Sequence, residues 1–314
     1  MKKNKSSKNL QISEKKETKT IPFKDDYNKL TPKNKLNSGL YIIATPIGNL
    51  GDMSIRAIQT LKSVDIIACE DTRRSLKLLD HYKIKKNLIP YHDHNGSKVR
   101  PKILRSLISG KSIALISDAG TPLISDPGYK LITEARLAKI PIFPIPGPSA
   151  LTAALSIAGI PANTFIFLGF LPTKKLSRLE IIKKYKDLDT SLVIYETSLR
   201  IKKLIKELLD ILGPRNTAIC REMTKIYEEV IYENLDSLEK TLSNKKIKGE
   251  IVVLVGPPSN KRIIDDNQVK KALMEELKKL NPSQASVKIA NITGNSRNKL
   301  YRMAIEIKKE MILK

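Results

Sequence analysis

Residues 112–128 read SIALISDAGTPLISDPG, and this stretch decides the fold class. Its first part, Ser112–Ile116, is a short and mostly apolar run with the length of one buried strand. A loop rich in Ser, Asp, Gly and Pro follows, and a helical pattern begins at about residue 128. A strand that passes through such a loop into a helix is typical of an α/β sheet with parallel strands.

The same alternation of short apolar runs and helical patterns continues on both sides of this stretch. It predicts βαβ units and a mostly parallel sheet, in which ligands bind beyond the carboxyl ends of the strands. The expected strands are 40–44, 65–68, 88–90, 112–116 and 140–145, and the expected helices are about 52–63, 72–82, 97–109 and 128–139.

A second α/β unit is expected after the sequence GFLP at 169–172. Two neighbouring apolar runs suggest an antiparallel pair there, so this sheet should be mixed. The expected strands lie near 191–195, 216–221, 226–231 and 250–255, and the expected helices near 175–186, 198–212 and 234–243. After a Pro-containing linker, helices are expected at about 266–279, 283–292 and 296–310.

These patterns divide the chain into four parts. Residues 1–36 form a polar, Lys-rich tail with too few apolar residues to repay its ordering by burial, so we expect disorder there. The α/β units are expected at 37–168 and 169–258, and a small all-helical domain at 259–314.

The charge of the chain is strongly unbalanced, with 57 basic and 32 acidic residues and a net charge of +25. Such an excess favours a polyanionic partner, because Lys and Arg neutralise phosphates. A genome rich in A and T, which inflates Lys, is the alternative. The two cysteines form no metal-type cluster, and no apolar run reaches the roughly 20 residues that span a bilayer. We therefore expect a cytoplasmic protein without a membrane segment.

Three loops follow predicted strands at the edge where such sheets bind ligands. The loop 117–128 is unusually long, which favours function over a simple turn before a helix. The loop 45–52 has two glycines and a proline, so a ligand could approach its backbone closely, although a plain tight connection would look the same. The loop 146–149 leads into a helix whose free N–H groups could hold a carboxylate or could simply be capped.

Two polar clusters follow other strands. One is CEDTRR at 69–74, and the other is YHDHN at 91–95. The His-x-His pattern alone could suggest a metal, but no further His or Cys ligand set accompanies it. Contacts with a substrate, or simple loop polarity, are favoured over a metal site.

Six motifs in order resemble those of one known family. They are ATPIGNLGD at 44–52, ACEDTR at 68–73, HDHN at 92–95, SDAGTPLISDPG at 117–128, PGPSA at 146–150 and GFLP at 169–172. The set resembles the RsmI-type 16S ribosomal RNA (cytidine-2′-O)-methyltransferases of the tetrapyrrole-methylase superfamily. The resemblance covers about residues 40–256, and although no single motif is decisive, the ordered set is highly specific.

The resemblance implies a two-domain tetrapyrrole-methylase-like α/β fold with mixed sheets, a homodimer, no metal, and S-adenosylmethionine held between the domains. It also implies 2′-O-methylation of a cytidine in the decoding centre of 16S rRNA (cytidine 1402), in the small ribosomal subunit. The motifs assign cofactor binding to Thr45, Pro46, Gly48, Asn49, Asp118, Ala119, Gly120, Thr121, Pro122, Pro146, Gly147 and Ser149.

By the same resemblance, Glu70, Arg73, Asp93 and His94 would lie near the site of methyl transfer. A ribose hydroxyl is a poor nucleophile, so a positioned base would help, and Glu70, Asp71, Asp93 and His94 remain the candidates. The chain departs from the family at 195–200, which lacks a His often found before the Arg there.

Two other functions compete with this interpretation. One is a small-molecule methylase that acts on a tetrapyrrole, and the other is a non-catalytic RNA-binding assembly factor. The basic charge and the extra helical domain argue against the first. The intact cofactor-type loops argue against the second.

Overall fold

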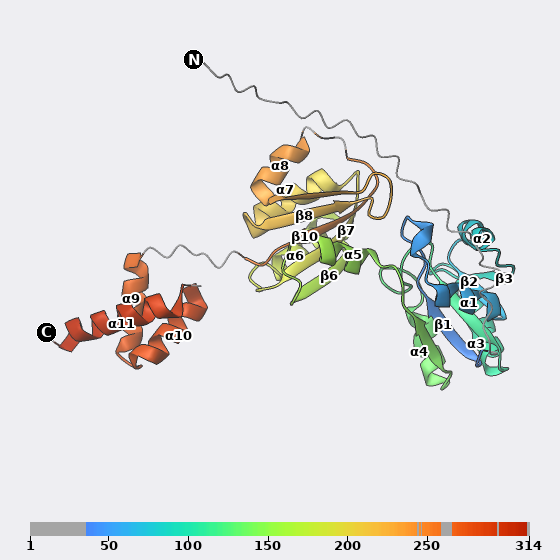
Figure 1. Cartoon of the computed structure of the whole chain (residues 1–314), viewed down its shortest axis with the longest axis horizontal. Coiled ribbons are helices and arrows are strands. Elements are labelled where there is room, and N and C mark those ends of the chain that lie inside the picture. The colour runs from blue at the N-terminus through green and yellow to red at the C-terminus, as the bar shows by residue number, and fades with distance from the viewer. Residues whose placement is uncertain (1–35, 244, 246, 259–265, 294, 313–314) are drawn as a thin grey trace, which may run out of the picture.

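The computed structural model describes residues 36–312, except for 244, 246, 259–265 and 294. The predicted tail therefore lies outside the described residues, apart from residue 36. Figure 1 shows two α/β bodies and a group of three C-terminal helices. No helix among the described residues is long and apolar enough to cross a membrane.

The first body is a five-stranded parallel sheet in the order β3-β2-β4-β1-β5. Its strands are β1 (Gly39–Ile43), β2 (Ile66–Cys69), β3 (Asn87–Pro90), β4 (Ser112–Ile116) and β5 (Ile142–Ile145). The connecting helices are α1 (Ile55–Ser63), α2 (Thr72–His81), α3 (Gly96–Ile108) and α4 (Tyr129–Leu137). The predicted parallel sheet is confirmed.

The central strand β4 shows why these residues form this sheet. Every one of its residues is buried, and its side chains alternate between two cores. Ala114 and Ile116 pack in the core that holds α1 and α2, whereas Ile113 and Leu115 pack in the core that holds α3 and α4. A continuous apolar run is what a parallel strand with helices on both faces requires.

The second body is a mixed sheet in the order β6-β7-β10-β8-β9 (Figure 1). Its strands are β6 (Phe165–Phe170), β7 (Ser191–Thr197), β8 (Asn216–Arg221), β9 (Glu229–Asn234) and β10 (Glu250–Val255). Only β6 and β7 pair in parallel, and β8 and β9 form the predicted antiparallel pair. The helices are α5 (Ala150–Ile157), α6 (Lys175–Lys184), α7 (Ile201–Leu212) and α8 (Leu235–Ser243).

Two features of this sheet differ from the sequence expectation. The strand β6 is absent from the predicted strands, and the expected domain boundary between 168 and 169 falls inside it. The end of β6 is irregular: the register shifts between Phe167 and Gly169, and Gly169 has a positive φ of +58°. The Gly and Pro residues near this irregular end make the sequence look like a turn. The strand β9 begins three residues later than expected, because two turns extend the loop to residue 228: Lys225 N–H donates to the carbonyl of Glu222, and Glu228 N–H donates to the carbonyl of Lys225.

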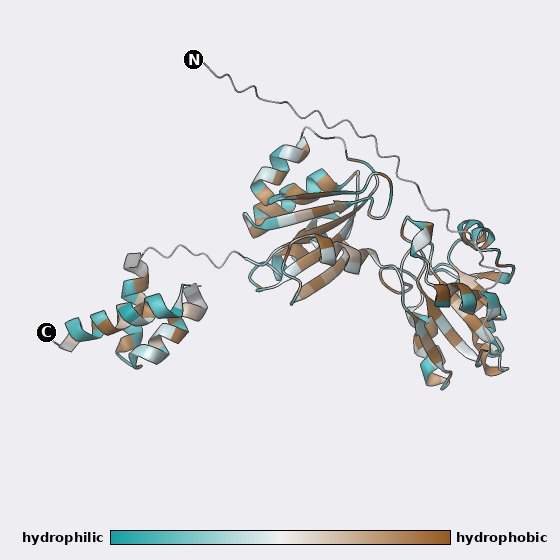
Figure 2. Cartoon of the chain, viewed as in Figure 1, coloured by the Kyte–Doolittle hydropathy of each residue, from teal (hydrophilic) through white to brown (hydrophobic). Residues whose placement is uncertain are grey.

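The C-terminal helices are α9 (Asp266–Leu277), α10 (Pro282–Thr293) and α11 (Arg297–Ile312), as the sequence predicts. They enclose a core of their own, which includes Leu273, Ile289 and Leu300. In Figure 2 the strands of both sheets are largely apolar, whereas the C-terminal helices carry many hydrophilic residues.

Candidate functional site

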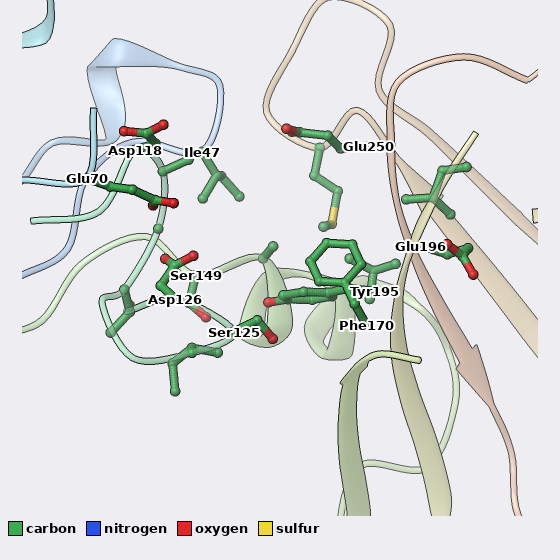
Figure 3. Close-up of a pocket in the computed structure, with 18 of the residues that line it drawn as sticks. Ile47, Glu70, Asp118, Ser125, Asp126, Ser149, Phe170, Tyr195, Glu196 and Glu250 are labelled. Carbon is green, nitrogen blue, oxygen red and sulfur yellow. The ribbon is translucent and has the colours of Figure 1, made fainter. Parts of the chain in front are cut away.

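A cavity of about 310 Å³ lies where loops from both sheets meet (Figure 3). Pockets that bind small molecules usually begin at about this size. One side consists of loops that follow strands of the parallel sheet, and the other side comes from the mixed sheet. The lining residues are Ile47, Glu70, Arg74, Asp118, Ala119, Gly120, Thr121, Ile124, Ser125, Asp126, Ser149, Ala150, Phe170, Tyr195, Glu196, Met223, Glu250, Ile251 and Val252.

The loop after β1 and the loop after β4 are locked together at the cavity. The backbones of Thr45 and Gly120 exchange two hydrogen bonds of 2.9 and 3.0 Å. The buried hydroxyl of Thr45 also donates to the carbonyl of Ser117 at 3.1 Å. Gly120 has a φ of +81°, which favours glycine at this position. The two loops therefore form one preorganised surface rather than two mobile segments.

The remainder of the β4 loop holds a strained backbone. Leu123 and Ser125 have φ values of 74° and 66°, in the left-handed region that is unfavourable for residues with a Cβ atom. Such strain persists where the surroundings impose it, and it concentrates at functional sites. Ser125 lines the cavity, so the strained segment is part of the site itself.

Three carboxylates gather on the side of the cavity built by the parallel sheet, and we call Glu70, Asp118 and Asp126 the carboxylate wall. Asp118 accepts hydrogen bonds from the backbone N–H of Asp71 at 3.1 Å and from the guanidinium of Arg74 at 3.0 Å. Burial raises the pKa of Glu70, and the charges of Asp118 and Asp126 raise it further.

The third member of the carboxylate wall has a similar environment. Burial raises the pKa of Asp126, and the nearby charge of Asp118 adds to this effect, although a hydrogen bond with Ser117 opposes it. Among the residues that line the cavity, Arg74 is the only Lys or Arg, and it pairs with Asp118, so Glu70 and Asp126 have no cation of the lining paired with them. The cavity would therefore favour a ligand that carries positive charge.

The opposite side contains two aromatic rings, Phe170 and Tyr195, which we call the aromatic wall (Figure 3). Their ring centroids are 5.6 Å apart in an edge-to-face arrangement. Burial raises the pKa of Tyr195 to about 12, so its hydroxyl stays protonated at neutral pH. Glu196 also borders the cavity, but Arg200 holds its carboxylate at 2.7 Å.

The structure places the predicted cofactor residues in two groups. Asp118, Ala119, Gly120, Thr121 and Ser149 line the cavity. The others lie in the same loops but do not line it: Thr45, Pro46, Gly48, Asn49, Pro122, Pro146 and Gly147. In the first loop, Ile47 reaches the cavity instead.

The predicted catalytic residues are also divided. Glu70 lines the cavity, whereas Arg73, Asp93 and His94 do not. Arg73 is 88% exposed and holds the carboxylate of Asp71, whose pKa its hydrogen bonds lower to about 2. The charge of Asp93 contributes to the raised pKa of Glu70, so Asp93 lies near the carboxylate wall without lining the cavity.

Sequence reasoning missed several lining residues. The pattern around Asp126 indicates only the start of a helix, and Phe170 belongs to a family motif without a role of its own, yet both line the cavity. Tyr195 lies on β7 and Met223 in the loop after β8, and the sequence pattern indicates no cavity role for either. Within the described part of the chain, no group of three or more His, Cys, Asp or Glu residues is placed to hold a metal ion.

The sequence model of the tetrapyrrole (corrin/porphyrin) methylases matches residues 39–239, which include the parallel sheet and the mixed sheet except β10. The chain belongs to this family. Within it, proteins named ribosomal RNA small subunit methyltransferase I are close relatives. The one from Erythrobacter litoralis is 46% identical and covers 87% of this chain and 96% of its own length. The one from Mesorhizobium japonicum is 42% identical and covers 88% and 95%.

Two solved structures with low sequence identity share the fold. Diphthine synthase has a TM-score of 0.54 at 12% identity, over 69% of this chain and 89% of its own. The methyltransferase CobJ has a TM-score of 0.53 at 17% identity, over 70% and 94%. The expected tetrapyrrole-methylase-like fold is thus confirmed, with one parallel and one mixed sheet.

Proposed function

We propose that this chain is an S-adenosylmethionine-dependent methyltransferase that methylates the ribose 2′-hydroxyl of a cytidine in the decoding centre of 16S rRNA. The observation that carries the proposal is the high identity, over nearly the whole length, to proteins named ribosomal RNA small subunit methyltransferase I. The cavity and the net charge of +25 support it independently.

The cavity suits S-adenosylmethionine because of its charge. This cofactor carries a sulfonium cation and an amino group, and the carboxylate wall has incompletely compensated negative charge. Asp118 and the backbone of 119–121 would hold it, together with Ser149 at the start of α5. Bound there, the cofactor supplies a methyl group on a sulfur that leaves with its bonding electron pair when an oxygen attacks the methyl carbon.

The chain itself must orient the ribose and remove the hydroxyl proton. Positioning alone contributes up to about 7–11 kcal/mol in well-oriented reactions. We assign Glu70 as the group that accepts the proton, since it alone among the predicted catalytic residues lines the cavity. Its raised pKa makes it a stronger base than an ordinary glutamate.

The exposed arginines beside Glu70 would hold the RNA backbone. The side chains of Arg73 and Arg74 are 88% and 72% exposed, and Arg74 also lines the cavity. Their planar guanidinium groups suit phosphate contacts. Asp93 and His94 would act at the periphery of the same region. Action as a homodimer on the small ribosomal subunit in the cytoplasm is part of the proposal.

The test is methyl transfer from tritiated S-adenosylmethionine to small subunits from a strain that lacks this protein. Resistance to alkaline hydrolysis then maps the modified linkage. One resistant linkage, at a decoding-centre cytidine, is the expected result. Label in uroporphyrinogen or a precorrin, and none in RNA, would favour the tetrapyrrole alternative. Cofactor binding without transfer to any substrate would contradict the proposal.

A further inference from the structure

Phe170, at the end of β6, is a large apolar side chain left open to solvent beside the cavity. It lines the cavity and is 56% exposed, whereas the other aromatic lining residue, Tyr195, is partly buried. Figure 3 shows both rings on the side opposite Glu70 and Asp118. A single exposed apolar residue is common in proteins, so exposure alone assigns no function to it. The backbone that carries this ring provides the second observation.

Two guanidinium groups hold the three residues that follow Phe170. Arg200 donates to the carbonyl of Leu171 at 3.1 Å. Arg178 donates to the carbonyls of Pro172 and Thr173 at 2.9 and 2.8 Å. Three successive carbonyls are therefore fixed by side chains rather than by a strand partner.

Both guanidinium groups are themselves fixed by carboxylates. Arg178 and Glu207 form a buried bidentate pair at 2.7 and 2.8 Å. Arg200 and Glu196 form a second pair at 2.7 and 3.0 Å. Of the two, the Arg178–Glu207 pair is buried on both sides. A buried ion pair contributes little net stability compared with apolar packing, so its presence next to the segment that follows Phe170 favours a positioning role.

Gly169, the residue before Phe170, packs closely against the β4 loop. Gly169 has a φ of +58°, and a Cβ atom there would lie 2.8 Å from the hydroxyl of Ser125 in the strained β4 loop. The backbone of Phe170 is thus held between the β4 loop and the two arginines. The backbone at this ring is therefore held in place, while more than half of the residue stays exposed.

We propose that Phe170 stacks on the base of the nucleotide whose ribose is methylated. This inference rests on the proposed function. A ribose that reaches into the cavity must leave its neighbours in the RNA, and its base then loses its stacking partners. Proteins that bind unstacked bases replace those partners with aromatic side chains. Tyr195 lies deeper, so Phe170 is the ring that an incoming nucleotide meets first.

The test compares four variants of the full chain: Phe170→Ala, Phe170→Leu, Phe170→Tyr and, as a matched control, Phe165→Ala. Phe165 is on the same strand and is 40% exposed, but it does not line the cavity. For each variant, KM and kcat are measured with unmethylated small subunits, and the Kd for S-adenosylmethionine is measured by calorimetry.

We expect Phe170→Ala to lower kcat/KM for the subunits by about 10-fold or more, with a cofactor Kd within about twofold of the wild type. Phe170→Tyr should restore most of the loss, Phe170→Leu should not, and Phe165→Ala should resemble the wild type. A loss of cofactor affinity equal to the loss in kcat/KM would place the ring against the cofactor and overturn the inference. Unchanged kinetics for Phe170→Ala, or full activity for Phe170→Leu, would also overturn it. A wild-type chain that methylates no RNA would instead refute the proposed function.

Discussion

The two walls of the cavity come from sheets that are built in different ways. The carboxylate wall follows strands of a parallel sheet, whose carboxyl ends all meet at one edge. The aromatic wall comes from neighbouring strands of a mixed sheet, β6 and β7, and its backbone depends on two ion pairs. The first wall holds negative charge that Arg74 compensates only in part, and the second holds exposed apolar surface. The difference suggests separate tasks. The carboxylate wall would hold the cofactor and accept the ribose proton at Glu70, and the aromatic wall would hold the base of the target nucleotide.

The largest expected effect is on the carboxylate wall, in the variant Glu70→Gln. A base must be deprotonated to act, so the rate should rise with pH and level off above a pKa that is higher than that of an ordinary glutamate. Glutamine cannot accept the proton, and kcat should fall about 10²–10⁴-fold with loss of this rising limb. Single-turnover methylation across pH provides the measurement. An unchanged pH profile would remove Glu70 from the mechanism.

The next largest effect is expected for the buried ion pair between Arg178 and Glu207, which supports the backbone of the aromatic wall. Arg178→Ala leaves the buried Glu207 without its partner, and the free energy of unfolding should fall by about 3–5 kcal/mol. The double variant Arg178→Met, Glu207→Leu removes both charges and should recover most of this stability. Urea denaturation measures both. A loss below about 1 kcal/mol for Arg178→Ala would contradict the described burial of this pair.

The basic C-terminal helices lie outside both walls, and their contribution should be mainly electrostatic. Replacing Arg297, Lys299 and Arg302 on α11 with Gln removes three positive charges. The slope of log K against log salt should then become shallower by about 1 for each phosphate that is no longer neutralised, with little change in the modified position. Binding of the variant to small subunits at several salt concentrations measures this slope. An unchanged slope would assign the excess charge to composition rather than to RNA binding.

The smallest expected effect is a gain in stability from Asp126→Asn. The fold raises the pKa of Asp126, so its contribution to stability is present below the unfolded pKa and is lost as pH rises through the folded pKa. At neutral pH the charge therefore opposes folding, and its removal should stabilise the chain by about 1 kcal/mol. Thermal unfolding at pH 7 tests this.

Asp65, at the other end of the same sheet, is the matched control. The N–H and hydroxyl of Ser112 both donate to its carboxylate at 2.7 Å and lower its pKa. Its charge stabilises the fold above the unfolded pKa, and this stability is lost as pH falls through the folded pKa. Asp65→Asn should therefore destabilise the chain at pH 7. The same sign for both variants would contradict the assigned environments.

The different construction of the two sheets also explains which cavity residues could be located from the sequence. In a parallel sheet, apolar strands such as Ser112–Ile116 are recognisable from their composition, and the loops after them must converge. Asp118 could therefore be expected at the ligand-binding edge from its position, and Glu70 from its position together with the family resemblance. In the mixed sheet, convergence depends on strand order and on a register shift near Gly169. Phe170 and Tyr195 carry no local signal for that arrangement.

The most direct test of separate tasks is calorimetric titration of S-adenosylmethionine into the wild-type chain and Asp118→Asn. Asp118 accepts hydrogen bonds from Arg74 and from the backbone of Asp71, and its negative charge would face the cation of the cofactor. Removing this charge should therefore weaken cofactor binding by about 10-fold or more. The same variant keeps Arg74 and the aromatic wall, so its affinity for unmethylated small subunits should change much less than its affinity for the cofactor. Wild-type cofactor affinity in Asp118→Asn, together with weakened binding to the subunits, would contradict the assignment of this wall to the cofactor.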